Sequence, residues 1–198
     1  MINKKIPWWA PQVGSAEERK LINQALDNNF VNEGPLATEF EQAIARLVGA
    51  KFAIATPNCT SAIFLALKAL GVGHGDEVIV PDITFIATAN AVHLTGAAPI
   101  LVDIEPLTLT ISIDAIRQAI TPRTKAIVPV HVTGRAANMD AIISLANEYN
   151  LMVVEDAAEA LLSKYHGKFL GTLGQAGCFS FSPNKTITTG QGGMIVTN

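Results

Sequence analysis

The sequence predicts an α/β fold with a mostly parallel central sheet and helices on both faces. Short strand-like segments alternate with amphipathic helical segments, which is typical of parallel strands joined by helical crossovers. The strand-like segments read as nearly uninterrupted apolar runs, such as VIV at 78–80 and AIVPV at 126–130, as expected for strands buried on both faces. A hydrophobic content of 49% with only 16% charged residues indicates a large buried sheet or a large subunit interface.

Two helices are expected before the alternation begins. Ser15 and Glu18 have the spacing of a capping box, which predicts a helix from Ser15 with an apolar face of Leu21, Ile22, Ala25 and Leu26. The Gly34-Pro35 pair is incompatible with the middle of a helix, so we expect a loop over Phe30–Leu36. A second amphipathic helix follows over Ala37–Val48 and ends at Gly49.

The remainder of the chain supplies the sheet and its covering helices. No internal repeat, low-complexity tract or linker interrupts it, which indicates one domain. The apolar runs predict strands over Phe52–Thr56, Glu77–Val80, Pro99–Val102, Ala126–Val130, Met152–Val154, Cys178–Phe181 and Met194–Thr197. Helical periodicity and glycine stops predict helices over Ser61–Leu70, Phe85–Leu94, Ser112–Ile120 and Met139–Tyr149.

Charge and cysteine content narrow the class of protein. A formal net charge of -3 gives no indication of a basic surface that would bind nucleic acid or an anionic membrane. The chain has neither a secretory signal pattern nor an apolar run of the ~18 residues that a membrane span requires. Its two cysteines are too few for a disulfide framework. We therefore expect a soluble cytoplasmic protein that binds neither nucleic acid nor membrane.

Ligands of open α/β sheets bind beyond the carboxyl ends of the strands, so the residues that follow each strand are the candidates for a site. Thr60 and Ser61 follow the first sheet strand and open a helix, where backbone amides and two hydroxyls would suit a phosphate group. The alternative is ordinary capping of that helix by Thr60 or Asn58. Phe85 follows the second strand and could stack on a planar ring, or it could simply be a buried core residue.

Carboxylates follow a later strand. A carboxylate at the end of a buried strand needs a cationic partner, which for Asp156 could be a protonated pyridine nitrogen, an arginine or a metal ion. The histidines do not have the spacing of any recognised metal-binding motif, which argues against a metal site. His131 ends another strand and could face the same cleft.

Lys185 lies in an otherwise uncharged segment, CFSFSPNKTITTGQGGM, close to Ser180. Burial lowers the pKa of an amine and makes it a usable nucleophile for Schiff-base formation. Alternatively, Lys185 is a turn residue that extends its amine to water. A phosphate cradle, a stacking ring, an acid for a ring nitrogen and an amine for an aldehyde together match pyridoxal 5′-phosphate (PLP) better than any other common cofactor.

The chain also resembles a known family along its whole length, from about Ile6 to Asn198. The resemblance lies in ordered motifs: NEGP, NCTSAIFLALKALGVGHGDEVIVPDITFIATANAV, AAPILVDIEPLTLTI, AIVPVHVTGRAANMDAI, VVEDAAEA and FSFSPNKTITTGQGGMIVT. These motifs are similar to those of the PLP-dependent sugar aminotransferases of the DegT/DnrJ/EryC1/StrS family, within the fold-type I superfamily. One such motif would be weak, but this series in this order is specific.

The resemblance implies a role for each candidate residue. Lys185 matches the lysine that forms the Schiff base with PLP and later transfers the proton, and Asp156 matches the carboxylate that keeps the pyridine nitrogen protonated. Phe85 matches the stacking ring, and Glu159 matches a position near the ring hydroxyl that is glutamine in many relatives. The phosphate contacts are matched by Thr60, Ser61 and Ser180.

The resemblance also implies a substrate and an assembly. DAAEA resembles the GDP-perosamine synthase branch, which implies a nucleotide-linked 4-keto-6-deoxy sugar as acceptor and glutamate as amino donor, in a homodimer with the site at the subunit interface. Ser182 and TTGQGG depart from the histidine and TGEGG of many relatives, which weakens the assignment of a particular sugar. Because relatives continue into a second, smaller domain, we expect residues 1–198 to form the PLP-binding large domain alone.

Two other functions are compatible with the sequence. The chain could be a catalytically inactive remnant that serves as a binding or scaffold domain, or a related PLP-dependent enzyme such as a sugar dehydratase. The dehydratase branch has histidine in place of the lysine, so Lys185 argues against it.

Overall fold

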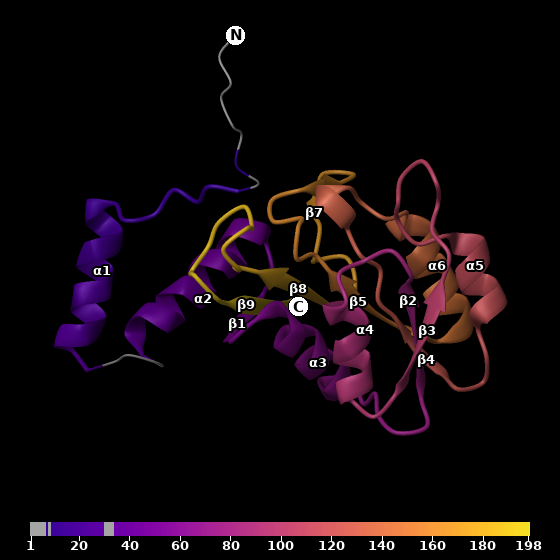
Figure 1. Ribbon diagram of the computed structural model, residues 1–198. Coiled ribbons are helices and arrows are strands. Elements are labelled where there is room, and N and C mark those ends of the chain that lie inside the picture. Colours follow the sequence, from indigo (N-terminus) through magenta and orange to yellow (C-terminus); the bar gives the residue numbers. More distant parts are fainter. Residues whose placement is uncertain (1–6, 8, 30–33) are drawn as a thin grey trace, which may run out of the picture.

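A seven-stranded sheet forms the centre of the protein in a computed structural model that describes residues 7, 9–29 and 34–198 (Figure 1). The strand order is β1-β9-β8-β5-β4-β2-β3, parallel throughout from β8 to β3 and antiparallel on both sides of β9. The predicted mostly parallel sheet is therefore confirmed. The strands are β1 Phe52–Thr56, β2 Glu77–Pro81, β3 Ala98–Val102, β4 Thr124–Ile127, β5 Met152–Asp156, β8 Ala176–Ser180 and β9 Gly193–Thr197.

Helices cover both faces of this sheet, as the sequence predicts. Helices α3 (Cys59–Ala69) and α4 (Ala87–Leu94) pack on one face, in a buried cluster that includes Val154 of β5. The next strand residue, Val153, packs with α5 and α6 on the opposite face, because neighbouring side chains of a strand alternate. Helices α2 (Pro35–Val48), α5 (Ile113–Ala119) and α6 (Met139–Tyr149) cover that face. No helix in the described ranges has the length and apolar character needed to cross a membrane.

Helix α1 (Ala16–Asp27) forms where the capping signal predicts it. Glu18 accepts from the Ser15 amide at 2.5 Å and its own amide donates to the Ser15 hydroxyl at 3.1 Å, which confirms the capping box. None of the residues of α1 is buried, and the helix stands apart from the sheet in Figure 1. The larger side chains of its apolar face, Leu21, Ile22 and Leu26, are exposed rather than packed against the sheet.

Helices α2, α3 and α4 start at other residues than predicted. Pro35 is the first residue of α2 rather than part of the preceding loop, since the first residue of a helix needs no amide hydrogen. Residues 30–33 of the predicted loop lie outside the described residues. Helix α4 starts at Ala87 rather than Phe85, and α3 starts at Cys59 rather than Ser61.

The central strands also end at other residues than predicted. Strand β4 ends at Ile127 instead of continuing to Val130, because Pro129 has no amide to donate to a neighbouring strand. Strand β5 extends two residues further than predicted, to Asp156, whose amide donates to the Pro129 carbonyl at 2.9 Å. The structure adds a small hairpin that was not predicted, β6 (Lys164–Tyr165) with β7 (Lys168–Phe169), and a short 3-10 turn at Val132–Gly134.

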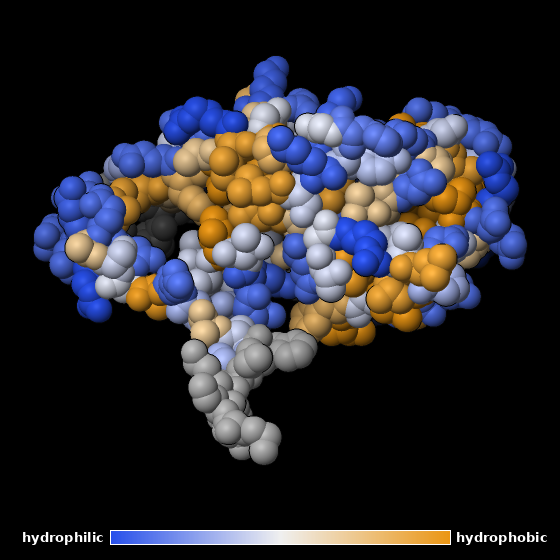
Figure 2. Space-filling view, turned by 90° about the horizontal axis from the view of Figure 1, so that it is seen from above, coloured by the Kyte–Doolittle hydropathy of each residue, from blue (hydrophilic) through white to orange (hydrophobic). Residues whose placement is uncertain are grey.

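Apolar side chains are also numerous on the surface, where Figure 2 shows them gathered in patches on the face seen from above. Four exposed apolar residues lie at the two ends of α4: Ile83, Phe85 and Ile86 before it and Leu94 as its last residue. The apolar composition of the chain therefore fills a buried sheet and leaves large side chains exposed as well.

Candidate active site

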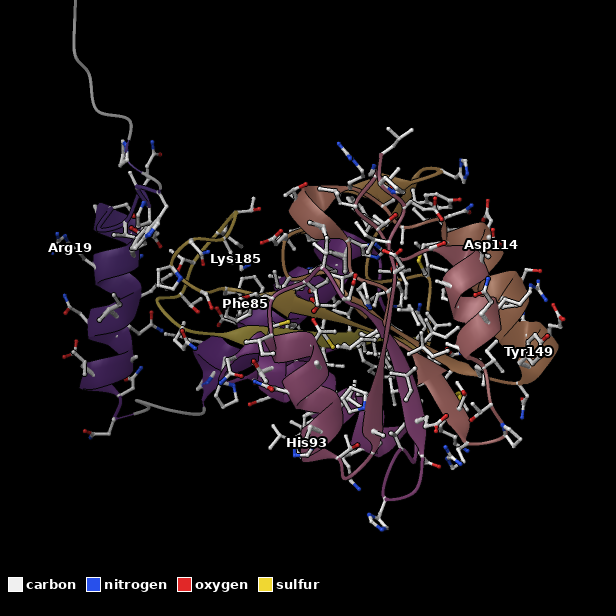
Figure 3. The ribbon with its side chains drawn as sticks, turned by 45° about the vertical axis from the view of Figure 1, so that its right-hand side comes forward. Arg19, Phe85, His93, Asp114, Tyr149 and Lys185 are labelled. Carbon is white, nitrogen blue, oxygen red and sulfur yellow. The ribbon has the colours of Figure 1, made fainter. Side chains whose placement is uncertain are left out.

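A pocket of about 820 Å³ opens beyond the carboxyl ends of the strands. Apart from β9, the strands of the sheet run in one direction, so the segments that follow β1, β2, β5 and β8 converge at this end. Figure 3 shows Phe85 and Lys185 close together there, away from His93, Asp114 and Tyr149. The pocket lining contains all seven residues to which the resemblance gives a role: Thr60, Ser61, Phe85, Asp156, Glu159, Ser180 and Lys185.

The N-terminus of α3 forms one wall of the pocket. Asn58 is the N-cap, and its side chain accepts from the Ser61 amide at 2.8 Å, so Asn58 rather than Thr60 caps this helix. A helix start leaves four backbone amides without hydrogen-bond acceptors, and the cap provides an acceptor for only some of them. The positive end of an eleven-residue helix therefore faces the pocket together with the side chains of Thr60 and Ser61.

Gly193, the first residue of β9, allows the start of α3 to lie against the sheet. A Cβ atom at this position would lie 2.4 Å from the backbone carbon of Asn58 and 2.5 Å from its carbonyl oxygen. Those contacts are with backbone, so a flexible side chain could not move away to relieve them. The sequence showed a glycine-rich turn here, but it did not show that Gly193 sets the position of the helix start.

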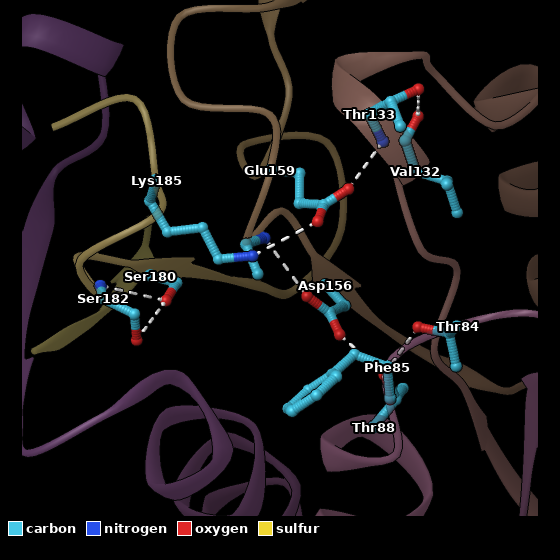
Figure 4. A network of polar contacts seen from close by, with 11 residues as sticks. Thr84, Phe85, Thr88, Val132, Thr133, Asp156, Glu159, Ser180, Ser182 and Lys185 are labelled. Carbon is cyan, nitrogen blue, oxygen red and sulfur yellow. Dashed lines mark hydrogen bonds and ion pairs between the residues drawn. The ribbon is translucent and has the colours of Figure 1, made fainter. Parts of the chain in front are cut away.

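Asp156 is the most buried ionisable group in the pocket lining, with 5% of its surface exposed. Its Oδ2 accepts from the Thr88 hydroxyl at 2.8 Å and its Oδ1 accepts from the Ala158 amide at 3.1 Å (Figure 4). Burial raises the pKa of this carboxyl, and the hydrogen bond from Thr88 is the largest influence in the opposite direction. Among the described residues, no basic group lies within 4.0 Å of the carboxylate, so the carboxylate is available to a cation supplied by a ligand.

Glu155 and His131 form a buried pair outside the pocket lining. His131 is fully buried, and its Nε2 lies 2.9 Å from Glu155 Oε2. Because Nδ1 accepts from the Ala137 amide at 3.2 Å, the ring proton is on Nε2 and the imidazole is neutral. The sequence allowed His131 to face the cleft, but its ring bonds to Glu155 and does not line the pocket. Glu155 instead holds the segment before β8, since its carboxylate also accepts from the amides of Gly171, Leu173 and Gly174.

Lys185 lies in the loop after β8 and points across the pocket. Its side chain is 16% exposed, and Nζ lies 3.3 Å from Glu159 Oε1. Glu159 is held in turn by the Thr133 amide, which donates to Oε2 at 2.8 Å. Lys185 therefore does not extend its amine into open water, as the alternative of a solvated turn lysine requires.

Ser180 and Phe85 complete the predicted set. Ser180 ends β8, is buried, and donates from its hydroxyl to the Ser182 hydroxyl at 3.2 Å. Phe85 is 78% exposed at the segment that leads into α4, so its interpretation as a buried core residue was wrong. The residue that the sequence reasoning missed is Thr88, which reaches Asp156 from α4. The available signal was a threonine shortly after the end of β2, among alanines.

The described residues contain no group of three or more His, Cys, Asp and Glu side chains arranged to hold a metal ion.

Comparison with known proteins identifies the family. A family model described as the DegT/DnrJ/EryC1/StrS aminotransferase family matches residues 12–198. The chain belongs to this family. The resemblance inferred from the motifs is thereby confirmed.

Curated members of the family match the chain over nearly its whole length. It is 48% identical over 190 residues to "GDP-perosamine synthase" of Caulobacter vibrioides, covering 96% of this chain and 51% of that protein. It is 44% identical over 196 residues to "Spore coat polysaccharide biosynthesis protein SpsC" of Bacillus subtilis, covering 99% of this chain and 50% of that protein. The chain thus spans about half the length of the curated relatives it matches.

Solved structures of sugar aminotransferases share this fold. The PLP form of the putative sugar aminotransferase Spr1654 from Streptococcus pneumoniae superposes with a TM-score of 0.92 at 30% identity, covering 98% of this chain and 53% of that one. DesI, determined in the presence of its TDP-sugar product, superposes with a TM-score of 0.88 at 38% identity, covering 96% of this chain and 48% of that one.

The burial of Asp156 predicts a particular dependence of stability on pH. Because burial raises its pKa in the folded chain, the folded state binds this proton more tightly than the unfolded state does. The stabilising effect of the proton is complete below the ordinary aspartate pKa of about 4, and it is lost as the pH rises through the raised value. Asp156→Asn should therefore make the cofactor-free chain more stable at pH 7, by about 1.4 kcal/mol per unit of raised pKa.

Urea unfolding of both proteins at several pH values measures this difference. An asparagine fits the site, because the Thr88 hydroxyl can accept from the new amide and donate to the Phe85 carbonyl, 3.3 Å away. The advantage of Asp156→Asn should shrink as the pH is lowered. A variant that is less stable at pH 7, or an advantage that does not change with pH, would contradict the account.

Gly193→Ala should destabilise the chain and displace the start of α3. The new Cβ would overlap the Asn58 backbone, so we expect a loss of roughly 2 to 4 kcal/mol in the free energy of unfolding. Gly73→Ala is the matched control, since its Cβ would approach only the flexible end of Lys68, at 3.8 Å, and its cost should be within about 1 kcal/mol. Equal costs for the two variants in urea unfolding would show that the close contact at Gly193 is unimportant.

Proposed function

We propose that the protein of which this chain forms a part is a PLP-dependent aminotransferase that converts a nucleotide-linked 4-keto-6-deoxy sugar into an amino sugar. The observation that carries the proposal is the convergence of Lys185, Asp156, Phe85 and the start of α3 on one pocket, in a chain of an aminotransferase family.

The residues of the pocket fit PLP at each part of the molecule. A volume of about 820 Å³ lies within the usual range for small-molecule sites. The amides and hydroxyls at the start of α3 suit a phosphate, and Ser180 adds a hydroxyl from the end of β8. Asp156 provides a buried carboxylate, and no basic residue among the described residues forms an ion pair with it. A pyridinium nitrogen would supply the missing cation.

Each side chain has a distinct task in this proposal. Lys185 would hold the cofactor through Nζ and is the amine placed to hold or move a proton there, with Glu159 Oε1 3.3 Å away. Asp156 would keep the proton on the ring nitrogen, and Phe85 would cover one face of the ring and exclude water. When bound, PLP supplies an electron-withdrawing ring that stabilises negative charge on the substrate carbon.

The names of the relatives support the proposed substrate class. "GDP-perosamine synthase" names a nucleotide-linked amino sugar, and SpsC is named for polysaccharide biosynthesis. DesI was determined with its TDP-sugar product. We infer a nucleotide-sugar acceptor, with glutamate as the amino donor, and a product used in polysaccharide or glycan biosynthesis.

We further propose that two copies of the chain associate next to the pocket. Ile83, Phe85 and Leu94 line the pocket and are exposed, and Ile86 beside them is exposed as well. Large exposed apolar side chains at the rim of a pocket are typical of a surface that another protein covers. A homodimer with this rim at its interface would shield both the ring of Phe85 and the bound cofactor from water.

Covalent attachment of PLP to Lys185 tests the proposal most simply. The purified chain is incubated with PLP, reduced with borohydride and digested, and the pyridoxyl group is located by peptide mass. We expect the modification at Lys185, together with its absence from Lys185→Ala. The control is Lys20→Ala, which removes an exposed lysine of α1 and should leave the modification unchanged.

The contrary result is equally clear. Circular dichroism shows whether the chain is folded. The proposed attachment would be overturned if a folded chain carried no pyridoxyl group at Lys185, or if exposed lysines were modified equally. The interpretation of the chain as a non-catalytic binding domain would then be preferred.

A further inference from the structure

We propose that Thr88 is a positioning residue of the active site, whose hydroxyl orients the Asp156 carboxylate and holds it as the anion that a cationic ring nitrogen needs. The proposal rests on the proposed function for the identity of the ring, but the contact itself lies within this chain. Thr88 is fully buried in α4, and its Oγ1 lies 2.8 Å from Asp156 Oδ2. It does not line the pocket and so would not touch the cofactor.

The hydroxyl of Thr88 has one proton and three oxygen neighbours. Asp156 Oδ2 is at 2.8 Å, the Thr84 hydroxyl at 3.1 Å and the Phe85 carbonyl at 3.3 Å. The carboxylate is both the nearest acceptor and the charged one, so the proton is donated to it. Thr84 can then donate to Thr88, which gives a directed chain from Thr84 through Thr88 to Asp156 (Figure 4).

This bond matters because the two carboxylate oxygens have few other donors. Oδ1 accepts from the Ala158 amide, on the same strand end, whereas Oδ2 accepts from Thr88 alone among the described residues. An isosteric apolar side chain at position 88 would leave Oδ2 buried without a donor. Loss of this donor destabilises the ionised carboxylate more than the protonated acid, because a buried charge depends more strongly on hydrogen bonds.

The other charged and titratable groups around Asp156 do not replace this bond. His131 is neutral and directs its Nε2 proton to Glu155, and Lys185 Nζ is engaged by Glu159. The thiols of Cys59 and Cys178 are buried, which raises their pKa well above the usual range and keeps them uncharged. Burial raises the pKa of Asp156, and Thr88 is the largest influence that lowers it.

Thr88 also joins the carboxylate to the proposed stacking ring. Its amide donates to the Phe85 carbonyl at 3.2 Å, so the backbone that carries Phe85 is bonded to the residue whose hydroxyl orients Asp156. Thr88 therefore contacts both groups that would flank a bound ring: the Asp156 carboxylate at its nitrogen and the segment that carries Phe85 at its face.

The test compares Thr88→Val, which removes the hydroxyl and keeps the shape, with Thr88→Ser, which keeps the hydroxyl. Thr95→Val is the matched control, because Thr95 is a buried threonine at the other end of α4 whose hydroxyl donates to the Val92 carbonyl at 2.7 Å. The first readout uses the cofactor-free chain with carboxyl-labelled aspartate. The Asp156 signal is assigned by its absence from Asp156→Asn, and its pKa is followed by carbon-13 NMR.

We expect Thr88→Val to shift the pKa of Asp156 upward, and Thr88→Ser and Thr95→Val to leave it near the wild-type value. An unshifted pKa in folded Thr88→Val, or equal shifts in Thr88→Val and Thr95→Val, would overturn the proposal. If Thr88→Val does not fold, Thr84→Val decides, because loss of the Thr84 donor should move the pKa in the same direction by a smaller amount; no shift there overturns it.

The second readout is the dissociation constant for PLP, followed by the visible absorbance of the bound cofactor. Loss of one hydrogen bond to a charged group predicts roughly tenfold weaker binding in Thr88→Val and about wild-type binding in Thr88→Ser. Unchanged binding in Thr88→Val would count against the positioning role. A wild-type chain that binds no PLP would refute the proposed function, while the NMR readout would still decide the role of Thr88.

Discussion

The buried carboxylate of Asp156 is the constraint on which the site depends. It ends a central strand, has 5% of its surface exposed and receives only an amide and a hydroxyl from the described residues around it. A carboxylate in that environment is costly to ionise, so its retention as an anion needs a cationic partner. The remaining groups of the pocket are arranged so that one molecule could bring that cation, a phosphate and an aldehyde together.

The sheet topology brings these groups together although they are far apart in the sequence. The strands before them are parallel to one another, so their carboxyl ends deliver the start of α3, the α4 segment, Asp156 and Lys185 to the same edge. Two buried contacts then fix the positions of the neighbouring backbone segments. The close approach at Gly193 places the start of α3, and Glu155 with His131 fixes the backbone on the far side of the strand that carries Asp156.

Much of this could be predicted from the sequence, because the strands are continuous apolar runs and the polar residues follow them directly. The fold class and most of the pocket residues follow from this pattern and the position of strand ends, whereas Glu159 was assigned from the family resemblance. What could not be predicted were relations between side chains: that His131 turns away to Glu155, that Thr88 reaches Asp156, and that the apolar face of α1 does not cover the sheet. Such relations depend on tertiary distances, which periodicity and propensity do not contain.

The protonation state of the ring nitrogen tests the central claim most directly. PLP labelled with nitrogen-15 in the ring would be bound to the chain, and its NMR shift would be followed with pH. We predict a nitrogen that stays protonated well above the pH at which free PLP loses this proton, and that loses it in Asp156→Asn. A nitrogen that titrates as in free PLP, or that is unaffected by Asp156→Asn, would contradict the account of Asp156 as its partner.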